Sequence, residues 1–320
     1  MSVNSEKIVQ LFILSRDRCD YCREAVSSAI AQTSTSHEVI ISDNSIGSDV
    51  SIMLAREFPF VKVIRRNPTM PALAHFNCLI KEATAEFVVL FHDDDILDTC
   101  YVERMLALFK ENPEVSAIGC NANIVRGNFQ TKKKMMGDFK GSKILYDVND
   151  FIFPYLSLVT VNPAPFPGYM YRTRVIRSLS LERDSGGKHA DVSFLCNIVL
   201  QAPILWIDEV LFKYRIHAKN DSVYESITDR LRWLGYVYSV TNFSPKSIAV
   251  RDYKFLYWWR WVHQCISKSG LLRAIITINN RKLVALKFIT FYGFSLIICR
   301  KHFWRRFYNL SFSKLTDLFG

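Results

Sequence analysis

Short apolar runs alternate with stretches of helical spacing over the first 120 residues of the chain. Strand-like runs are predicted at residues 8–14, 39–42, 61–64, 87–91 and 115–120. The stretches between them place apolar side chains three and four residues apart, which predicts helices at residues 23–32, 50–58, 73–82 and 101–110. Repeated strand–helix units predict an α/β fold, with a mostly parallel sheet and helices on both of its faces.

Polar residues follow three of these apolar runs, where each strand is expected to end. Ser15 and Arg16 follow the first run, Asp43 follows the second, and Asp93 begins a set of three aspartates after the fourth. In open α/β sheets, ligands bind beyond the carboxyl ends of the strands. We therefore expect these side chains to share one crevice.

The three aspartates come directly after His92 and a buried run. Adjacent carboxylates repel one another unless a positive charge lies among them. A hard divalent cation, Mn²⁺ or Mg²⁺, takes oxygen ligands and is commonly shared with substrate phosphates, so the cluster predicts a metal that holds a diphosphate. Hydrolysis, phosphoryl transfer and glycosyl transfer all stay open at this point. So does a structural role, in which the aspartates cap the helix at residues 101–110.

The middle of the chain has three segments of different character. Residues 126–143 are polar, basic and rich in turn formers, which favours a solvated loop. Residues 161–168 (VNPAPFPG) are too rich in proline for a helix or a central strand, so we expect them to form a wall of the crevice. A Gly-Gly break at residues 186–187 precedes an amphipathic helix that starts near Asp191. A carboxylate in the first turn of a helix is common, so Asp191 alone says little.

The charge of the chain is unevenly distributed. Residues 1–250 hold 28 lysines and arginines against 28 acidic residues, whereas residues 251–320 hold 13 against 2. The net charge of +11 therefore belongs to the last quarter of the chain, which also carries four of the six tryptophans. The composition, 49% hydrophobic and 22% charged, is that of a folded protein and excludes a disordered one.

The basic C-terminal part mixes aromatic and cationic side chains, as in the run YWWRW at residues 257–261. Residues 283–299 are mainly apolar with Lys287 among them, and seventeen residues are at the short end for a membrane span. The composition favours a helix that lies on an anionic membrane surface. A packed helical subdomain and a true span are the alternatives. The chain shows no nucleic-acid-binding motif, so we expect no nucleic-acid partner.

Eight cysteines show no spacing typical of a disulfide framework, and the first residues lack the pattern of a signal peptide. We therefore expect reduced thiols and a cytoplasmic location, peripheral on the membrane face. Cys19 and Cys22 form the one CxxC motif, for which ordinary structural cysteines are favoured over a redox pair.

Five segments, taken in order, resemble the inverting glycosyltransferases of family 2, which have the GT-A fold. They are LFILSRDRCDYCREAVSSAIAQT, EVIISDNSIGSD, ALAHFNCLIKEATAEFVVLFHDDDIL, GGKHADVSFL and YRIHAKNDS. The first three are similar to the family's aromatic-Asn-Arg turn, its Val-Asp-Asp-x-Ser turn, and its Ala-Arg-Asn helix with the Asp-x-Asp strand. The last two stand where the family has its Glu-Asp catalytic pair and its Tyr-Arg-x-His ending. The resemblance covers about residues 7–222.

The resemblance implies a metal-dependent enzyme of the bacterial surface-polysaccharide type. It would move a sugar from a nucleoside diphosphate sugar, with a UDP-sugar favoured, to a saccharide or lipid-linked saccharide in O-antigen or capsule synthesis. Ser15 and Arg16 would line the nucleotide pocket, Asp43 would accept a hydrogen bond from the base, and Asp93 would contact the ribose.

The remaining roles concern the metal and the proton. By resemblance, Asp94 would bind the metal (Mn²⁺ or Mg²⁺) with Asp95 beside it. His217 would approach the diphosphate or the metal from the far side. Asp191 would be the general base that deprotonates the acceptor hydroxyl. The chain departs from the family pattern at His92, which replaces a common first acid, at Arg16 and Asp17, which replace the aromatic-Asn pair, and at Ala190, which replaces a Glu.

These observations predict a GT-A domain at residues 1–224 and a basic, aromatic helical region at residues 225–320. A non-catalytic nucleotide-sugar-binding or membrane-adaptor protein of the same fold is the alternative. A phosphohydrolase with Asp93 as the nucleophile is disfavoured, because Leu97 stands where that class needs Thr or Val.

Overall fold

In a computed structural model of the 320-residue chain, the structure describes residues 7–127, 129–157, 162–217 and 226–256. The chain divides into two compact units, one of residues 1–151 with 162–240 and one of residues 152–161 with 241–320. The first unit contains the whole sheet, and residues 248–256 of the second are helical. Much of the predicted basic region, residues 257–320, lies outside the described part of the chain.

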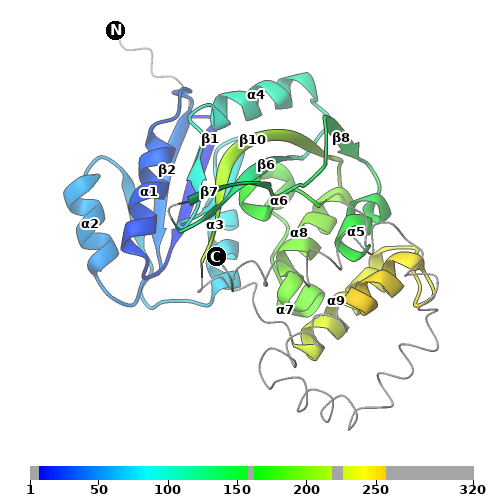
Figure 1. The fold of residues 1–320 in the computed structure, drawn as a ribbon. Helices are drawn as coiled ribbons and strands as arrows, with labels where there is room; N and C mark the ends of the chain where they lie inside the picture. The colour runs from blue at the N-terminus through cyan, green and yellow to red at the C-terminus, as the bar shows by residue number, and fades with distance from the viewer. Residues whose placement is uncertain (1–6, 128, 158–161, 218–225, 257–320) are drawn as a thin grey trace, which may run out of the picture. The chain divides into compact units, whose positions relative to one another are not determined.

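Four parallel strands form the first half of the sheet (Figure 1). They are β1 (Val9–Ser15), β2 (His37–Asp43), β3 (Lys62–Arg65) and β4 (Phe87–His92), in the order β3-β2-β1-β4. The helices between and after them are α1 (Cys19–Ile30), α2 (Asp49–Glu57), α3 (Ala72–Glu82) and α4 (Tyr101–Glu111). Each of these elements lies within a few residues of its predicted position, so the α/β prediction is confirmed.

The second half of the sheet continues beyond β4. Strand β9 (Tyr169–Arg172) runs antiparallel to both β4 and β6 (Ala117–Arg126), and β10 (Ile204–Ile216) runs parallel to β6. Two reversals restore the direction, so β6 and β10 point the same way as β1 and β4. The carboxyl ends of all these long strands therefore meet at one edge of the sheet.

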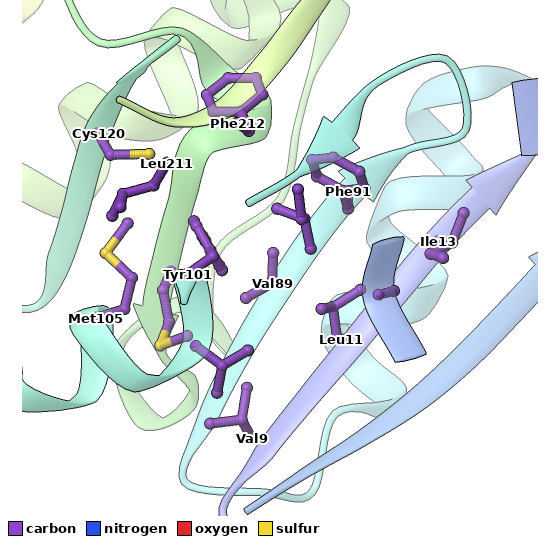
Figure 2. Close-up of a cluster of buried hydrophobic side chains, with 14 of the residues drawn as sticks. Val9, Leu11, Ile13, Val89, Phe91, Tyr101, Met105, Cys120, Leu211 and Phe212 are labelled. Atoms are coloured by element: carbon purple, nitrogen blue, oxygen red, sulfur yellow. The ribbon is translucent and has the colours of Figure 1, made fainter. Parts of the chain in front are cut away.

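The core explains why the apolar runs become strands. Val9, Leu11 and Ile13 alternate along β1, and Val89 and Phe91 do so along β4, so that each set points to one face of the sheet (Figure 2). Figure 2 shows that the same cluster extends to Tyr101 and Met105 of α4, and to Cys120, Leu211 and Phe212 of β6 and β10. The intervening residues of β1 and β4 are also buried, as expected for parallel strands covered on both faces.

The remaining elements belong to the first unit except where noted. They are β5 (Ile96–Leu97), β7 (Phe129–Lys134), β8 (Ser142–Leu145), α5 (Val148–Leu156, which runs into the second unit), η1 (Phe166–Gly168), α6 (Thr173–Ile176), α7 (Arg183–Gly186), η2 (Gly187–His189), α8 (Ala190–Val199) and α9 (Ile227–Val240). Gly187 has a φ of +61°, and a Cβ there would lie 2.5 Å from the Asp229 backbone oxygen. Only glycine therefore lets η2 pack this closely against α9.

The prediction of a solvated loop at residues 126–143 was wrong. The segment contains β7, which pairs with β6, and the start of β8, which pairs with β10. Strand β7 is exposed on both faces, so its side chains show no apolar alternation that the sequence could reveal.

Within the described residues, no helix has the length and hydropathy needed to cross a bilayer. The segment at residues 283–299 lies outside them. The domain boundary predicted after residue 224 stays a prediction.

Candidate active site

The carboxyl ends of the parallel strands bring the predicted donor-side residues together. Ser15, the last residue of β1, pairs with Asp43 at the end of β2, and Leu14 pairs with His92 at the end of β4. The three aspartates follow His92 directly, so one edge of the sheet carries all the polar residues that the sequence places at strand ends. The register thus creates the cluster before any side-chain interaction is considered.

The turn after β1 is fixed by Asp17, which has a φ of +54°. Its amide donates to the Ser45 hydroxyl at 2.8 Å, and its carboxylate accepts from the Ile46 amide at 2.8 Å. Aspartate tolerates this left-handed conformation because its short side chain bonds locally. These bonds tie the β1 turn to the β2 turn and direct the following residue, Arg18, toward β4.

Asp43 is fully buried and already bonded to protein donors. Its carboxylate accepts from the Ser45 amide at 3.0 Å, the Ser51 hydroxyl at 2.5 Å and the Arg65 guanidinium at 2.6 Å. Burial alone would raise the pKa of Asp43, but these hydrogen bonds outweigh burial and hold the pKa below its usual range. Asp43 therefore organises the β2 turn, and its role toward a nucleotide base stays a prediction.

Arg18 supplies the positive charge among the aspartates. Its guanidinium forms an ion pair with Asp93 and lies 2.7 Å from Asp94 Oδ2, bridging the two carboxylates. The sequence analysis did not assign Arg18 a role. The available signal was its place in the turn that also holds Ser15 and Arg16, at the arginine position of the family's aromatic-Asn-Arg pattern.

Asp93 is completely buried at the end of β4. Its Oδ2 accepts a hydrogen bond from the Arg16 amide at 3.0 Å, so backbone as well as side chain holds it. Burial raises the pKa of Asp93 to about 6, although Arg18 and the Arg16 amide oppose the rise. This carboxylate therefore depends on nearby positive charge to stay ionised at neutral pH.

One carboxylate oxygen of Asp94 contacts both a guanidinium and an imidazole. Asp94 Oδ2 lies 2.9 Å from His217 Nε2 as well as 2.7 Å from Arg18. Burial would raise the pKa of Asp94, but His92, Arg18 and His217 together lower it. The structure thus brings His217, which follows β10, to the aspartate that the sequence selects as a metal ligand.

Asp95 is held by Arg215. The Arg215 amide donates to Asp95 Oδ1 at 2.9 Å, and its guanidinium donates to the Asp94 carbonyl at 3.0 Å and to Glu24 at 2.6 Å. The same guanidinium lies 4.5 Å from the centre of the Tyr21 ring. Burial and the neighbouring Asp94 raise the pKa of Asp95 well above its usual range. Arg215 was also missed, because its backbone contact cannot be seen in a sequence.

The residues present fit a divalent cation. One ligand atom each from His92, Asp94 and Asp95 can be chosen so that all three lie within 4.8 Å of one another. Asp95 Oδ2 is buried and has no hydrogen-bond partner among the described residues. An orphaned buried carboxylate oxygen is costly unless a cation or donor reaches it, and carboxylate oxygens suit Mn²⁺ or Mg²⁺. The structure therefore adds His92 to the candidate ligands.

The structure does not support the alternative that the aspartates cap a helix. The residue before α4 is Cys100, whose backbone amide donates a hydrogen bond to Asp98 Oδ1 at 3.2 Å. Asp93, Asp94 and Asp95 instead face Arg16, Arg18, His217 and Arg215.

Asp191 is the second residue of α8, about a hundred residues after the aspartate cluster. Burial raises the pKa of Asp191, and the charges of His189 and His92 partly oppose the rise. Phe166, from the proline-rich segment, packs against both His92 and Phe194 of α8, with ring centroids 6.2 and 6.3 Å apart, and so joins α8 to the strand.

The CxxC motif lies at the N-terminal end of α1. Cys19 and Cys22 lie in the first turns of α1, and all described cysteines are free. Burial raises the pKa of Cys22 to about 12, which keeps the thiol protonated and unreactive. This agrees with the structural interpretation of the motif.

Comparisons with known proteins identify the domain. Residues 11–164 match the model for glycosyl transferase family 2. TarS residues 1–349 from S. aureus, solved in complex with UDP-GlcNAc, is similar with a TM-score of 0.59 and 17% identity, over 85% of this chain and 78% of that chain. The mannosyltransferase PcManGT from Pyrobaculum calidifontis, solved in complex with GDP-Man and Mn²⁺, is similar with a TM-score of 0.50 and 14% identity, over 90% of this chain and 83% of that chain. No curated protein matches the chain. The fold likeness and the family match confirm the predicted GT-A fold.

Proposed function

Because this chain carries a family 2 glycosyltransferase domain and is a glycosyltransferase, we propose that it transfers a sugar with inversion of the anomeric configuration. The donor is a nucleoside diphosphate sugar, and the acceptor is a saccharide or a lipid-linked saccharide. UDP-GlcNAc and GDP-Man, the ligands of the two solved neighbours, are the first donors to examine, with a UDP-sugar favoured.

In this proposal the donor lies over the carboxyl ends of β1, β2 and β4. Ser15 and Arg16 line the nucleotide, with the Arg16 side chain about half exposed and able to reach it. Asp43 supports the base, either directly or through the β2 turn that it holds. Asp93 contacts the ribose.

Asp94 and Asp95, with His92 or His217, hold the divalent cation. When bound, the cation offsets the negative charge that develops on the departing nucleoside diphosphate. The chain's own contribution is to supply ligands that are already positioned by Arg215 and by the end of β4.

Asp191 acts as the general base. The observation that supports this role is that Asp191 comes from α8, a separate segment from the aspartates, and that α8 is joined to His92 through Phe166, whose ring centroid lies 6.2 Å from that of His92 and 6.3 Å from that of Phe194. Its side chain has no side-chain hydrogen-bond partner among the described residues, so it is available to accept a proton. Inversion needs the base on the opposite face of the sugar from the leaving diphosphate, and a base on α8 can meet that need.

The setting of the reaction follows from the sequence as a proposal. We expect surface-polysaccharide synthesis, of the O-antigen or capsule type, on the cytoplasmic membrane face. The basic region at residues 225–320 would hold the enzyme peripherally near a lipid-linked acceptor.

Replacement of Asp191 tests the proposal. Asp191→Asn should reduce turnover on the order of 10²–10⁴-fold and leave the dissociation constant of the donor unchanged, because the base acts only in the chemical step. Asp184→Asn, at a carboxylate that is 91% exposed on its side chain, is the matched control. NMR of the first-formed product should show the inverted anomer.

Full turnover in Asp191→Asn, or a retained anomeric configuration, would contradict the mechanism. Donor binding without turnover by the wild type, across donors and saccharide acceptors, would favour the non-catalytic alternative.

A further inference from the structure

Strand β7 and the end of β6 form a basic hairpin, defined here as residues 124–127 and 129–134. The chain reverses at Gly127, which has a φ of +57°. In β7, five of the six residues are exposed, and both faces of the strand are represented among them. Few apolar contacts support such a ribbon, so its composition reflects something other than core packing.

The topology places this hairpin at the site edge. Strand β10 pairs with one edge of β6 from Ala117 to Arg126. Both β9 and β7 must then use the other edge, β9 near Ala117–Gly119 and β7 near Asn123–Arg126. That edge faces β4, so β7 continues beyond the end of β9 on the side where the aspartates follow β4.

The pairing of β6 with β10 also places the hairpin near the aspartates. Arg126, at the turn, pairs with Ile216, and the next residue of β10's chain is His217, which contacts Asp94 at 2.9 Å. The hairpin therefore projects from the sheet at the same edge as the proposed donor site.

The charges of the hairpin are unusual for this domain. The hairpin contains four basic residues and no acidic one, within a 250-residue stretch that is neutral overall. All four are exposed and have no ion pair with any described residue: Arg126, Lys132, Lys133 and Lys134. Arginines elsewhere in the unit, such as Arg23 and Arg104, pair with carboxylates.

Phe129 adds an apolar group at the same place. It is the first residue of β7, directly across from Arg126, and it is 82% exposed. Lysines on an exposed edge strand also have a simpler role, because they prevent unwanted pairing with another strand. That role does not call for an exposed aromatic ring at the turn.

We propose that the basic hairpin docks the catalytic domain onto an anionic lipid bilayer, with Phe129 entering the headgroup layer. A projecting ribbon with lysines on both faces fits a planar anionic surface, and an aromatic ring beside cationic groups is typical of interfacial contacts. A dissolved phosphate polymer would be bound by charge alone and would not use the ring. This contact would turn the site edge toward the membrane.

The test uses the full chain, because its C-terminal region also carries charge. Binding is measured by co-sedimentation with phosphatidylcholine vesicles, with and without phosphatidylglycerol. Lys132→Gln/Lys133→Gln/Lys134→Gln is compared with a variant of equal charge, altered at exposed lysines on other elements: Lys62→Gln/Lys81→Gln/Lys110→Gln. Phe129→Ser is compared with Phe60→Ser, whose ring is 94% exposed.

The hairpin lysine variant should bind anionic vesicles roughly tenfold or more weakly, and the control should change little. Phe129→Ser should lose about fivefold, with Phe60→Ser unchanged. Amide hydrogen exchange at residues 129–134 should slow on anionic vesicles. Unchanged nucleotide binding shows that each variant is folded and that the donor site is intact.

Equal binding by the hairpin and control variants would overturn the proposal. A second result would also overturn it. In that result the hairpin lysine variant loses binding to polyphosphate in solution but keeps binding to vesicles, and Phe129→Ser changes neither. That second outcome would identify a dissolved phosphate polymer as the partner.

Discussion

Removal of Arg18 tests the electrostatic balance of the site. Its guanidinium bridges two carboxylates whose side chains are 0% and 9% exposed, and the Arg18 side chain is itself 29% exposed. Removing one partner of a fully buried ion pair costs about 3–5 kcal/mol. Because water reaches Arg18, we expect Arg18→Gln to cost about 2–4 kcal/mol in the absence of metal.

This loss is measurable as a melting temperature. A change of 1 kcal/mol shifts Tm by about 2–4 °C in a domain of this size, so scanning calorimetry should show a decrease of roughly 5–10 °C. Arg23→Gln, on the helix that follows Arg18, is the control. Its partner Asp20 is 88% exposed and its other partner, Glu57, is 25% exposed, so the expected cost is only about 0–1 kcal/mol.

The same variant should respond more strongly to metal. Mn²⁺ must share Asp94 with the guanidinium in the wild type, but in Arg18→Gln it meets uncompensated carboxylates. We expect Mn²⁺ to restore most of the lost Tm and to bind on the order of tenfold more tightly, as measured by electron paramagnetic resonance titration. An unchanged Tm, or weaker Mn²⁺ binding by the variant, would refute the idea that Arg18 and the metal compete.

Three further substitutions test the fold and its pH dependence. Burial, with help from Arg66, lowers the pKa of His75 to about 4 from 6.5. Stability due to neutral His75 is present above pH 6.5 and is lost as the pH falls toward 4, by about 3 kcal/mol. The free energies of unfolding of the wild type and His75→Asn, measured by urea melts, should therefore converge over that window. A constant difference between them would contradict this. Gly119→Ala would put a methyl group 2.5 Å from the Tyr169 ring and should cost about 1–3 kcal/mol in urea unfolding, whereas an unchanged midpoint would mean that the ring moves freely. Tyr169→Phe removes the oxygen that accepts from the Trp206 indole at 2.6 Å and should cost about 1–3 kcal/mol, unless equilibrium unfolding shows that the indole finds another acceptor.

The central parallel strands β1 and β4 were predictable because they are buried on both faces. Strands such as β1 and β4 are then continuous apolar runs, which a sequence displays directly. Strand β7 was not predictable in the same way, because solvent surrounds it and its residues follow no apolar period. Strand β9 is only four residues long and depends on β4 and β6 for its pairing, which no local pattern encodes.

The candidate site shows the same division. The aspartates and Ser15 lie at strand ends, and strand ends are readable from apolar runs. Arg18 reaches the aspartates only because Asp17 adopts a left-handed conformation and ties one turn to another. Arg215 acts partly through its backbone amide, which depends on the register of β10. Such contacts come from tertiary geometry and leave no spacing rule in the sequence.

The central claim is that the aspartate cluster at the end of β4 binds a nucleoside diphosphate through a divalent cation. Isothermal titration of UDP, GDP and dTDP, each with and without Mn²⁺, tests it most directly. The account predicts that at least one nucleotide binds only when Mn²⁺ is present, and that Asp94→Asn abolishes this dependence. If the folded protein binds none of the three under either condition, or binds one equally well without metal, the claim is contradicted.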